Sequence, residues 1–344
     1  MLPIQAVHGA TSKHAFSADG GRTMTSTHYL ARAGKDNFMS VLVEPGTGNI
    51  YAVGDRYTQP SQDTNTPGGS ANYHPSQRAV IIKFDKLGNI LWLRELSKDG
   101  ARNDPTDPLG TKSGGTQTWH RNDRFWDVCL NPLTHDIFVV GHTTSMEYDY
   151  YNWASPRSPD CLVAKYNSSG TLQWQKFYGR DLYEWLSLGG GWWYYSDDKF
   201  NYCAPFTDGR FVAAGQTSNN GGPGVGSINN NVMLTVWNDN GSVSWSKWLS
   251  INNSQNNTTS NVGATFVEGL DVDGNNNVYV LVGSHLVKFN SSGSVQWKKS
   301  WTSNIGYIRS LVVTKNGDAY IGAYSGPYGS YVPGMMKLNS SGTV

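Results

Sequence analysis

Six side chains of the kinds used in acid–base catalysis stand in stretches that we expect to be inserted between β-strands: His120, Asp123, Asp181, Glu184, Asp197 and Asp198. Two carboxyl groups at a suitable separation across a cleft can hydrolyse a glycosidic bond. The sequence does not supply that separation, and polar loop residues are mostly solvated. We therefore expect these side chains to be exposed, and we assign no catalytic residue.

Aromatic residues gather in the same inserted stretches, among Asn, Ser, Asp and Gly. Aromatic rings bury a large area at low entropic cost, which is typical of recognition surfaces, and a sugar offers its CH face to such rings. We predict that a ligand is bound by Trp119, Tyr148, Tyr150, Tyr151, Trp153, Tyr183, Trp185, Trp192, Trp193, Tyr194 and Tyr195. In the alternative interpretation, the rings only hold their own loops closed.

No pattern in the sequence indicates a metal or a cofactor. Residues 271–277 place oxygen donors at alternate positions, as a calcium loop does, but the twelfth loop position is Val282 instead of Glu. A tight turn is therefore expected there. Cys129, Cys161 and Cys203 are odd in number and widely spaced, so we expect buried thiols and no disulfide framework or zinc site.

The composition limits the classes of partner. In 344 residues, 27 Lys and Arg nearly balance 26 Asp and Glu, which argues against nucleic-acid binding. No apolar run is long enough for a transmembrane helix, and no signal peptide is visible, so we expect no membrane insertion. The unpaired cysteines favour synthesis in a reducing compartment.

A short motif recurs five times along the chain. It consists of an aromatic residue or Leu, then Asp or Asn, two further residues and Gly, and in four copies a Trp follows four residues after the Gly. The glycines are Gly88, Gly170, Gly241, Gly293 and Gly342, separated by 82, 71, 52 and 49 residues. A propeller blade needs about 40 to 50 residues, so the two shorter spacings fit nearly bare blades.

Each repeat also contains two apolar strands joined by a Gly-, Asn- or Asp-rich turn, and no stretch has helical periodicity. We predict an all-β fold, a β-propeller of four-stranded antiparallel blades. Five repeats are visible, at residues 40–96, 127–177, 202–248, 267–301 and 308–344. The tryptophan at the start of each fourth strand is expected to fill the contact between neighbouring blades.

The chain ends need a separate interpretation. Phe16-Ser17-Ala18-Asp19-Gly20 matches the recurring turn, with Met24 in place of Trp. We therefore predict that residues 1–38 hold the outer hairpin of a closing blade. That would give six blades, and the native chain would continue at least about 25 residues beyond Val344.

The lengths of the links between strands differ by position. Links from first to second and from third to fourth strand are short. Long links connect second to third strands (55–78, 142–159, 216–230 and 323–333) and successive repeats (97–126, 178–201 and 249–263). In an up-and-down blade these long links lie on one face. We expect a disc with one flat face and one elaborated face, and long loops are often functional.

The repeat resembles the bacterial and viral seven-bladed β-propeller (SBBP) repeats. The matching residues include Asp273-Gly274-Asn275, Val278-Tyr279-Val280, Gly283 and Lys288-Phe289-Asn290-Ser291-Ser292-Gly293. The tryptophan is similar to the docking tryptophan of quinoprotein propellers. Residues 17–23 resemble the Asp-box turn of sialidase-like propellers, which is structural. The resemblance implies a propeller fold and, more often than a cytosolic enzyme, a surface-associated or virion protein.

Together these features favour a non-enzymatic recognition or structural propeller of a bacteriophage particle, in a tail fibre, baseplate or capsid surface. It would be made in the host cytoplasm and would bind a host surface glycan or another virion protein through its inserted loops. Two alternatives stay open, namely a polysaccharide-degrading enzyme and a bacterial cell-surface or extracellular adhesion module. Homo-oligomerisation is also left open.

Overall fold

The computed structural model describes residues 37–58, 76–96, 123–143, 146–147, 155–156, 160–178, 196–219, 228–249, 266–301, 308–325 and 332–344. The regular elements in these ranges are all β-strands. The described residues contain no helix that is long and apolar enough to cross a membrane.

The strands form five consecutive antiparallel sheets, which we call blades 1 to 5. Blade 1 holds β1 (Asn37–Val43), β2 (Ile50–Thr58), β3 (Ser76–Phe84) and β4 (Ile90–Leu96). Blade 2 holds β5 (Arg124–Leu130), β6 (Ile137–Thr143), β9 (Asp160–Tyr166) and β10 (Leu172–Tyr178), and β7 (Met146–Glu147) and β8 (Ser155–Pro156) pair separately.

Blade 3 holds β11 (Ser196–Pro205), β12 (Phe211–Asn219), β13 (Ile228–Trp237) and β14 (Val243–Leu249). Blade 4 holds β15 (Val267–Val272), β16 (Val278–Val282), β17 (His285–Phe289) and β18 (Val295–Ser300). Blade 5 holds three described strands, β19 (Ile308–Val313), β20 (Ala319–Ser325) and β21 (Val332–Leu338).

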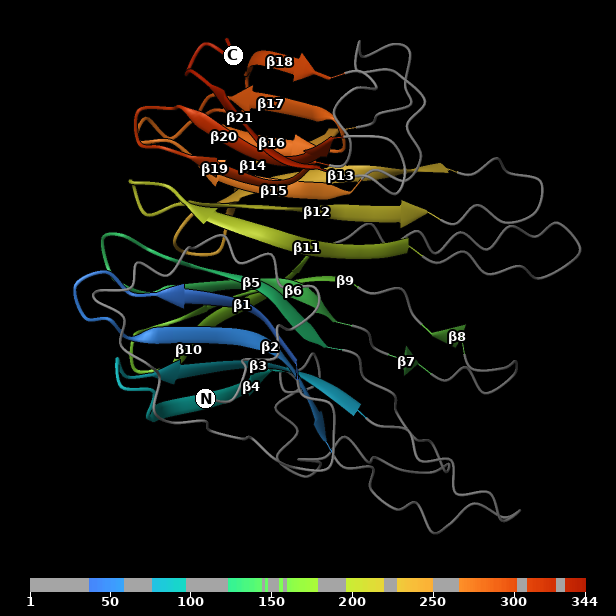
Figure 1. Ribbon diagram of the computed structural model, residues 1–344. Coiled ribbons are helices and arrows are strands. Elements are labelled where there is room, and N and C mark those ends of the chain that lie inside the picture. Colours follow the sequence, from blue (N-terminus) through green and yellow to red (C-terminus); the bar gives the residue numbers. More distant parts are fainter. Residues whose placement is uncertain are drawn as a thin grey trace, which may run out of the picture.

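The blades follow one another in chain order, from the blue blade 1 to the red blade 5 in Figure 1. The first strands of consecutive blades (β1, β5, β11, β15 and β19) contact one another in series, so they are the inner strands. The predicted all-β propeller of four-stranded antiparallel blades is confirmed. The segment predicted to hold the hairpin of a closing blade, residues 1–38, lies outside the described residues except for Asn37 and Phe38, which belong to β1. The sixth blade stays a prediction.

The core lies between neighbouring blades because each sheet has two apolar faces. Along β12, Phe211 and Ala213 join a cluster with blade 2, whereas Val212 and Ala214 join a cluster with blade 4. Side chains of a strand alternate between the two faces of a sheet, so one continuous apolar strand supplies both interfaces. Cys129, Cys161 and Cys203 are buried, as predicted.

The recurring Asn- or Asp-containing motif forms the tight turn that the sequence predicts. In blade 2, Oδ1 of Asn167 accepts hydrogen bonds from the backbone N–H groups of Ser169 and Thr171, and Gly170 has a φ of 81°. In blade 4, Oδ1 of Asp273 likewise accepts from backbone N–H groups, which makes residues 273–277 a turn and not a calcium loop.

The repeated tryptophan joins each blade to the next, as predicted. Its indole N–H donates to the carbonyl oxygen two residues before the marker glycine of the next blade. The pairs are Trp92 to Ser168 (3.2 Å), Trp174 to Asp239 (2.9 Å), Trp245 to Ser291 (2.9 Å) and Trp297 to Ser340 (3.0 Å).

The inner strands start earlier than the repeat boundaries drawn from the sequence. β1 starts at Asn37 instead of residue 40, β5 at Arg124 instead of 127, and β11 at Ser196 instead of 202. A β-bulge in each inner strand lets the pairing continue past the expected start. The pairing of β2 with β3 likewise continues to Thr58. Tyr57 therefore lies in a strand and not in the inserted link that was expected at residues 55–78.

The two ends of the blades differ in their connections. At one end, the links between first and second and between third and fourth strands have five or six residues. The longer connections leave from the opposite strand ends, which we call the loop-bearing end. Blade 4 is an exception there, because β16 ends at Val282 and β17 begins at His285.

Candidate recognition site at the loop-bearing end of the inner strands

The aromatic residues predicted to bind a ligand lie outside the described residues. This applies to Trp119, Tyr148, Tyr150, Tyr151, Trp153, Tyr183, Trp185, Trp192, Trp193, Tyr194 and Tyr195. Their role therefore stays a prediction, and the candidate site below is built from strand residues that the sequence did not single out.

The expectation that the candidate acid–base residues are solvated is wrong for two of them. Asp123 and Asp198 are each 1% exposed. The Thr143 hydroxyl donates to Oδ1 of Asp123 at 2.5 Å. β5 and β11 start earlier than expected, so Asp123 and Asp198 lie against the blades and are buried. Asp197 also lies in β11. His120, Asp181 and Glu184 lie outside the described residues.

Each inner strand contains one β-bulge at the equivalent position. The extra residues are Met39, Trp126, Asn201, Glu268 and Arg309, which we call the bulge row. A bulge re-aims a side chain and is over-represented next to functional sites. The inner strands contact one another in series, so the bulge row runs from blade to blade near the loop-bearing end.

Three bulges depend on a glycine in the neighbouring strand. In blade 2, a Cβ on Gly141 would overlap the carbonyl oxygen of Arg124, and Gly54 and Gly215 have the same relation to Asn37 and Lys199. The second strand therefore approaches the bulged backbone at a distance that only glycine allows. The glycines themselves are the sequence feature that accompanies these bulges, whereas the extra residue becomes visible only through the strand pairing.

The side chains of the bulge row differ in every blade, although the backbone feature repeats. The repeated tryptophan, by contrast, is the same in blades 1 to 4, and the marker glycine is the same in all five blades. Because the bulge recurs while its side chain differs, blade packing does not determine which residue type stands at this position. The row offers an indole, an amide, a carboxylate and a guanidinium, which are groups that orient polar ligands in binding sites.

Trp126 is surrounded by charged and polar groups of blades 2 and 3. The guanidinium of Arg124 lies 4.9 Å and the ammonium of Lys199 lies 5.8 Å from the centre of its ring. Its indole N–H donates to Nδ1 of His142 at 2.8 Å. Burial lowers the pKa of His142 to about 3, and the charges of Arg124 and Lys199 lower it further, so the imidazole is a neutral acceptor.

Arg124 also connects blade 2 to blade 1. Its Nε lies 2.6 Å from Oδ1 of the fully buried Asp55, and Nδ2 of Asn37 donates to Oδ2 of the same carboxylate at 3.1 Å. A buried carboxylate needs such partners because burial penalises its charged form. The pair thus fixes the guanidinium beside the Trp126 ring.

Glu268 and Arg309 form the corresponding pair between blades 4 and 5. The guanidinium and the carboxylate are 3.5 Å apart, and the Arg309 side chain is 54% exposed. Burial raises the pKa of Glu268, although Arg309 acts in the opposite direction. A long and partly exposed ion pair contributes little to stability, and the Arg309 guanidinium is accessible from solvent.

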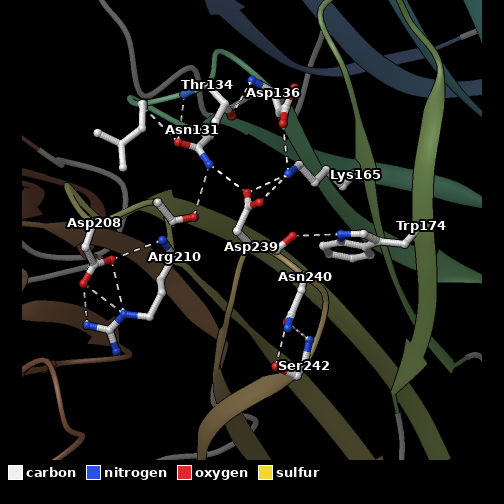
Figure 2. A network of polar contacts seen from close by, with 12 residues as sticks. Asn131, Thr134, Asp136, Lys165, Trp174, Asp208, Arg210, Asp239, Asn240 and Ser242 are labelled. Carbon is white, nitrogen blue, oxygen red and sulfur yellow. Dashed lines mark hydrogen bonds and ion pairs between the residues drawn. The ribbon is translucent and has the colours of Figure 1, made fainter.

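The opposite end of blades 2 and 3 is closed by the polar network in Figure 2. Asp239, in the turn before β14, accepts from Nζ of Lys165 at 2.7 Å and from Nδ2 of Asn131 at 2.8 Å. Asp136 lies 2.9 Å from the same ammonium group. Because these groups pair with one another across the interface, this network joins blades 2 and 3. Among the described residues, no group of three His, Cys, Asp or Glu side chains could hold a metal ion.

Comparisons with known proteins found similar solved structures at low sequence identity. No family model and no curated protein matches this chain. A structure of a Bacteroides caccae protein of unknown function is 13% identical, with a TM-score of 0.43, over 92% of this chain and 82% of that one. A PL25 ulvan lyase bound to a GlcA–Rha3S saccharide is 11% identical, with a TM-score of 0.43, over 90% and 68%. The Neurospora crassa Pan2 WD40 domain is 8% identical, with a TM-score of 0.33, over 63% and 62%.

Proposed function

We propose that this protein is a non-enzymatic recognition propeller that binds a glycan at the loop-bearing end of its blades. One observation carries the proposal, namely that the bulge row lies toward the same strand ends from which the longer connections leave. Among the described residues, the other end carries tight turns, and the polar groups of its network between blades 2 and 3 are paired with one another. The variable side chains of the bulge row and the starting points of the long connections thus lie at the same end of the blades.

Three described ionisable groups at this end, Asp55, Asp123 and His142, support binding rather than catalysis. Asp55 is held by Arg124, and Asp123 accepts from Thr143. An efficient general base has a pKa near the working pH, whereas the pKa of His142 is about 3. The Trp126 N–H also occupies its Nδ1.

The setting that we propose is a virus particle, with the protein in a tail fibre, a baseplate or the capsid surface, alongside other virion proteins. The support is the resemblance to SBBP repeats. Immunogold electron microscopy of purified native particles, with an antibody against the full chain, tests this setting. Label on the particles is the expected result. Label only on host-cell envelopes would instead favour an adhesion module of the bacterial surface.

A glycan array probed with the full chain tests the binding function. The expected result is selective binding with no release of product from the bound saccharide. The variant Arg309→Gln should bind several-fold more weakly, because it loses the charge of the most exposed ion-pair partner in the bulge row. The matched control is Lys315→Gln, an exposed cation in the turn between β19 and β20, at the other end of the blades.

A second candidate function, polysaccharide degradation, is favoured by Glu268. A partly buried carboxyl group with a raised pKa is suited to act as a general acid. New reducing or unsaturated ends during incubation with host polysaccharide, lost in Glu268→Gln, would support an enzyme and overturn the non-enzymatic proposal. No product with the wild-type chain, together with array binding, would support recognition.

A further inference from the structure

One lysine contact repeats at three of the four interfaces between the described blades. The lysine five residues before the marker glycine lies over an aromatic ring of its own blade and donates to the turn of the next blade. Nζ of Lys83 lies 4.9 Å from the centre of the Tyr51 ring and donates to Ser168. Nζ of Lys165 lies 5.7 Å from the centre of the Phe138 ring and donates to Asp239. Nζ of Lys288 lies 4.9 Å from the centre of the Tyr279 ring and donates to Ser340.

Blade 3 has Val236 at the lysine position, yet the contact is kept by another cation. Arg210 lies over the ring of Phe206, at 4.7 Å, and its Nη1 donates to the Ser291 carbonyl oxygen of blade 4 at 3.3 Å. All four described interfaces therefore place a cation, supported by an aromatic ring, against the turn of the next blade.

Blade 5 carries the same arrangement on the face that points away from blade 4. Nζ of Lys337 lies 5.5 Å from the centre of the Tyr320 ring and 2.8 Å from Oδ2 of Asp318. The same arrangement occurs in blade 2, where Lys165 lies over the ring of Phe138 and pairs with Asp136. The three interface lysines are 8 to 10% exposed, whereas Lys337 is 54% exposed.

The apolar residues of this face are exposed as well. Met335 is 77%, Val312 46% and Tyr324 45% exposed. In blades 2 to 4 the corresponding faces are buried in the clusters with the next blade. The face of β19–β21 therefore has the chemistry of an inter-blade surface and is uncovered among the described residues.

We propose that the turn Phe16–Gly20 of this same chain docks on the exposed face of β19–β21, with the carbonyl oxygen of Ala18 accepting a hydrogen bond from Lys337. In every receiving turn the accepting residue precedes the marker glycine by two, as Ser168 precedes Gly170. Ala18 has this relation to Gly20. The proposal is independent of the proposed function.

Buried side chains of blade 1, the first blade in the series, support the N-terminal segment as the occupant. Ile82, Val80 and Ala52 are 0%, 2% and 4% exposed, although they belong to none of the four clusters between described blades. They lie on the face of blade 1 that points away from blade 2. Residues 1–36 directly precede β1, which favours them as the segment between blade 1 and the exposed face of blade 5.

The variant Ala18→Asp tests the proposal in the full chain. It copies Asp239, the turn residue whose carboxylate lies 2.7 Å from Lys165. A carbodiimide, which joins a carboxylate directly to an amine, should link residue 18 to Lys337 within one chain, as detected by peptide mass spectrometry. The Lys165–Asp239 link in the same sample is the positive control.

The companion variant Ala18→Asp with Lys337→Met should lose this link and keep the control link. Links from residue 18 to other lysines only, with the control link present, would overturn the proposal. A link between residue 18 and Lys337 found only in a cross-linked dimer would also overturn it, because the occupant would then be a second copy of the chain.

Discussion

Gly170 of blade 2 lies against the indole ring of Trp92 of blade 1 so closely that a Cβ on this glycine would be 2.8 Å from Cδ2 of the ring. The indole N–H donates at the same time to the Ser168 carbonyl two residues earlier. The left-handed backbone of Gly170, with a φ of 81°, and the close approach of the Trp92 ring thus both favour glycine at this position.

Replacing Gly170 by alanine should destabilise the protein by about 2–4 kcal/mol, because the left-handed backbone costs alanine about 1 kcal/mol and overpacking costs roughly 1–3 kcal/mol. Urea unfolding followed by fluorescence measures the change. Gly46→Ala is the matched control, because its φ of 84° imposes the same strain while no atom lies within 4 Å of the added Cβ. It should cost about 1 kcal/mol. Equal losses in the two variants would show that the indole contact is unimportant.

Trp174→Phe removes the indole N–H that donates to the Asp239 carbonyl at 2.9 Å, together with part of the ring that lies on Gly241. We expect a loss of about 2–4 kcal/mol from the hydrogen bond and the cavity. Trp248→Phe is the control, since this residue of β14 is 44% exposed and its replacement should change stability by less than about 0.5 kcal/mol. Thermal unfolding of both variants compares them, and a smaller loss for Trp174→Phe would contradict the docking role.

His142 should make stability fall in mild acid. Its pKa is about 3 in the folded protein and about 6.5 when unfolded. Its contribution is complete above pH 6.5 and is lost as pH falls from 6.5 toward 3, by about 2 kcal/mol at pH 5. His142→Gln keeps an acceptor for the Trp126 N–H and removes the titration. Denaturant unfolding between pH 7.5 and 5 should therefore give a shallower pH dependence for the variant, and identical slopes would contradict burial of a neutral imidazole.

The Glu268–Arg309 pair should affect the pKa of Glu268. Arg309 opposes the rise that burial causes in the pKa of this carboxyl group, so Arg309→Met should raise the pKa further. Carboxyl carbon chemical shifts followed by NMR across the acid range measure it. Lys315→Met, at the opposite end of blade 5, should leave it unchanged. An unchanged Glu268 pKa in Arg309→Met would mean that the two groups do not pair in solution.

The elements with local causes were predictable from the sequence. Asn or Asp at a fixed distance before a glycine makes a turn through its own side chain, as Asn167 does, and β-branched runs between such turns make strands. The role of the repeated tryptophan was also predictable, because an aromatic residue at a fixed place in a repeat packs against the neighbouring repeat. The blade architecture follows from these local rules applied five times.

The sequence by itself thus determined the blade, its turns and the contact from Trp92 to the next blade. Only the tertiary structure decided which side chains gather at the loop-bearing end of the inner strands. A bulge becomes visible when two strands pair and one holds a residue too many, and the burial of Asp123 and Asp198 depends on how far that pairing extends. Register and burial are set by contacts between distant segments, and they have no local signature in the chain.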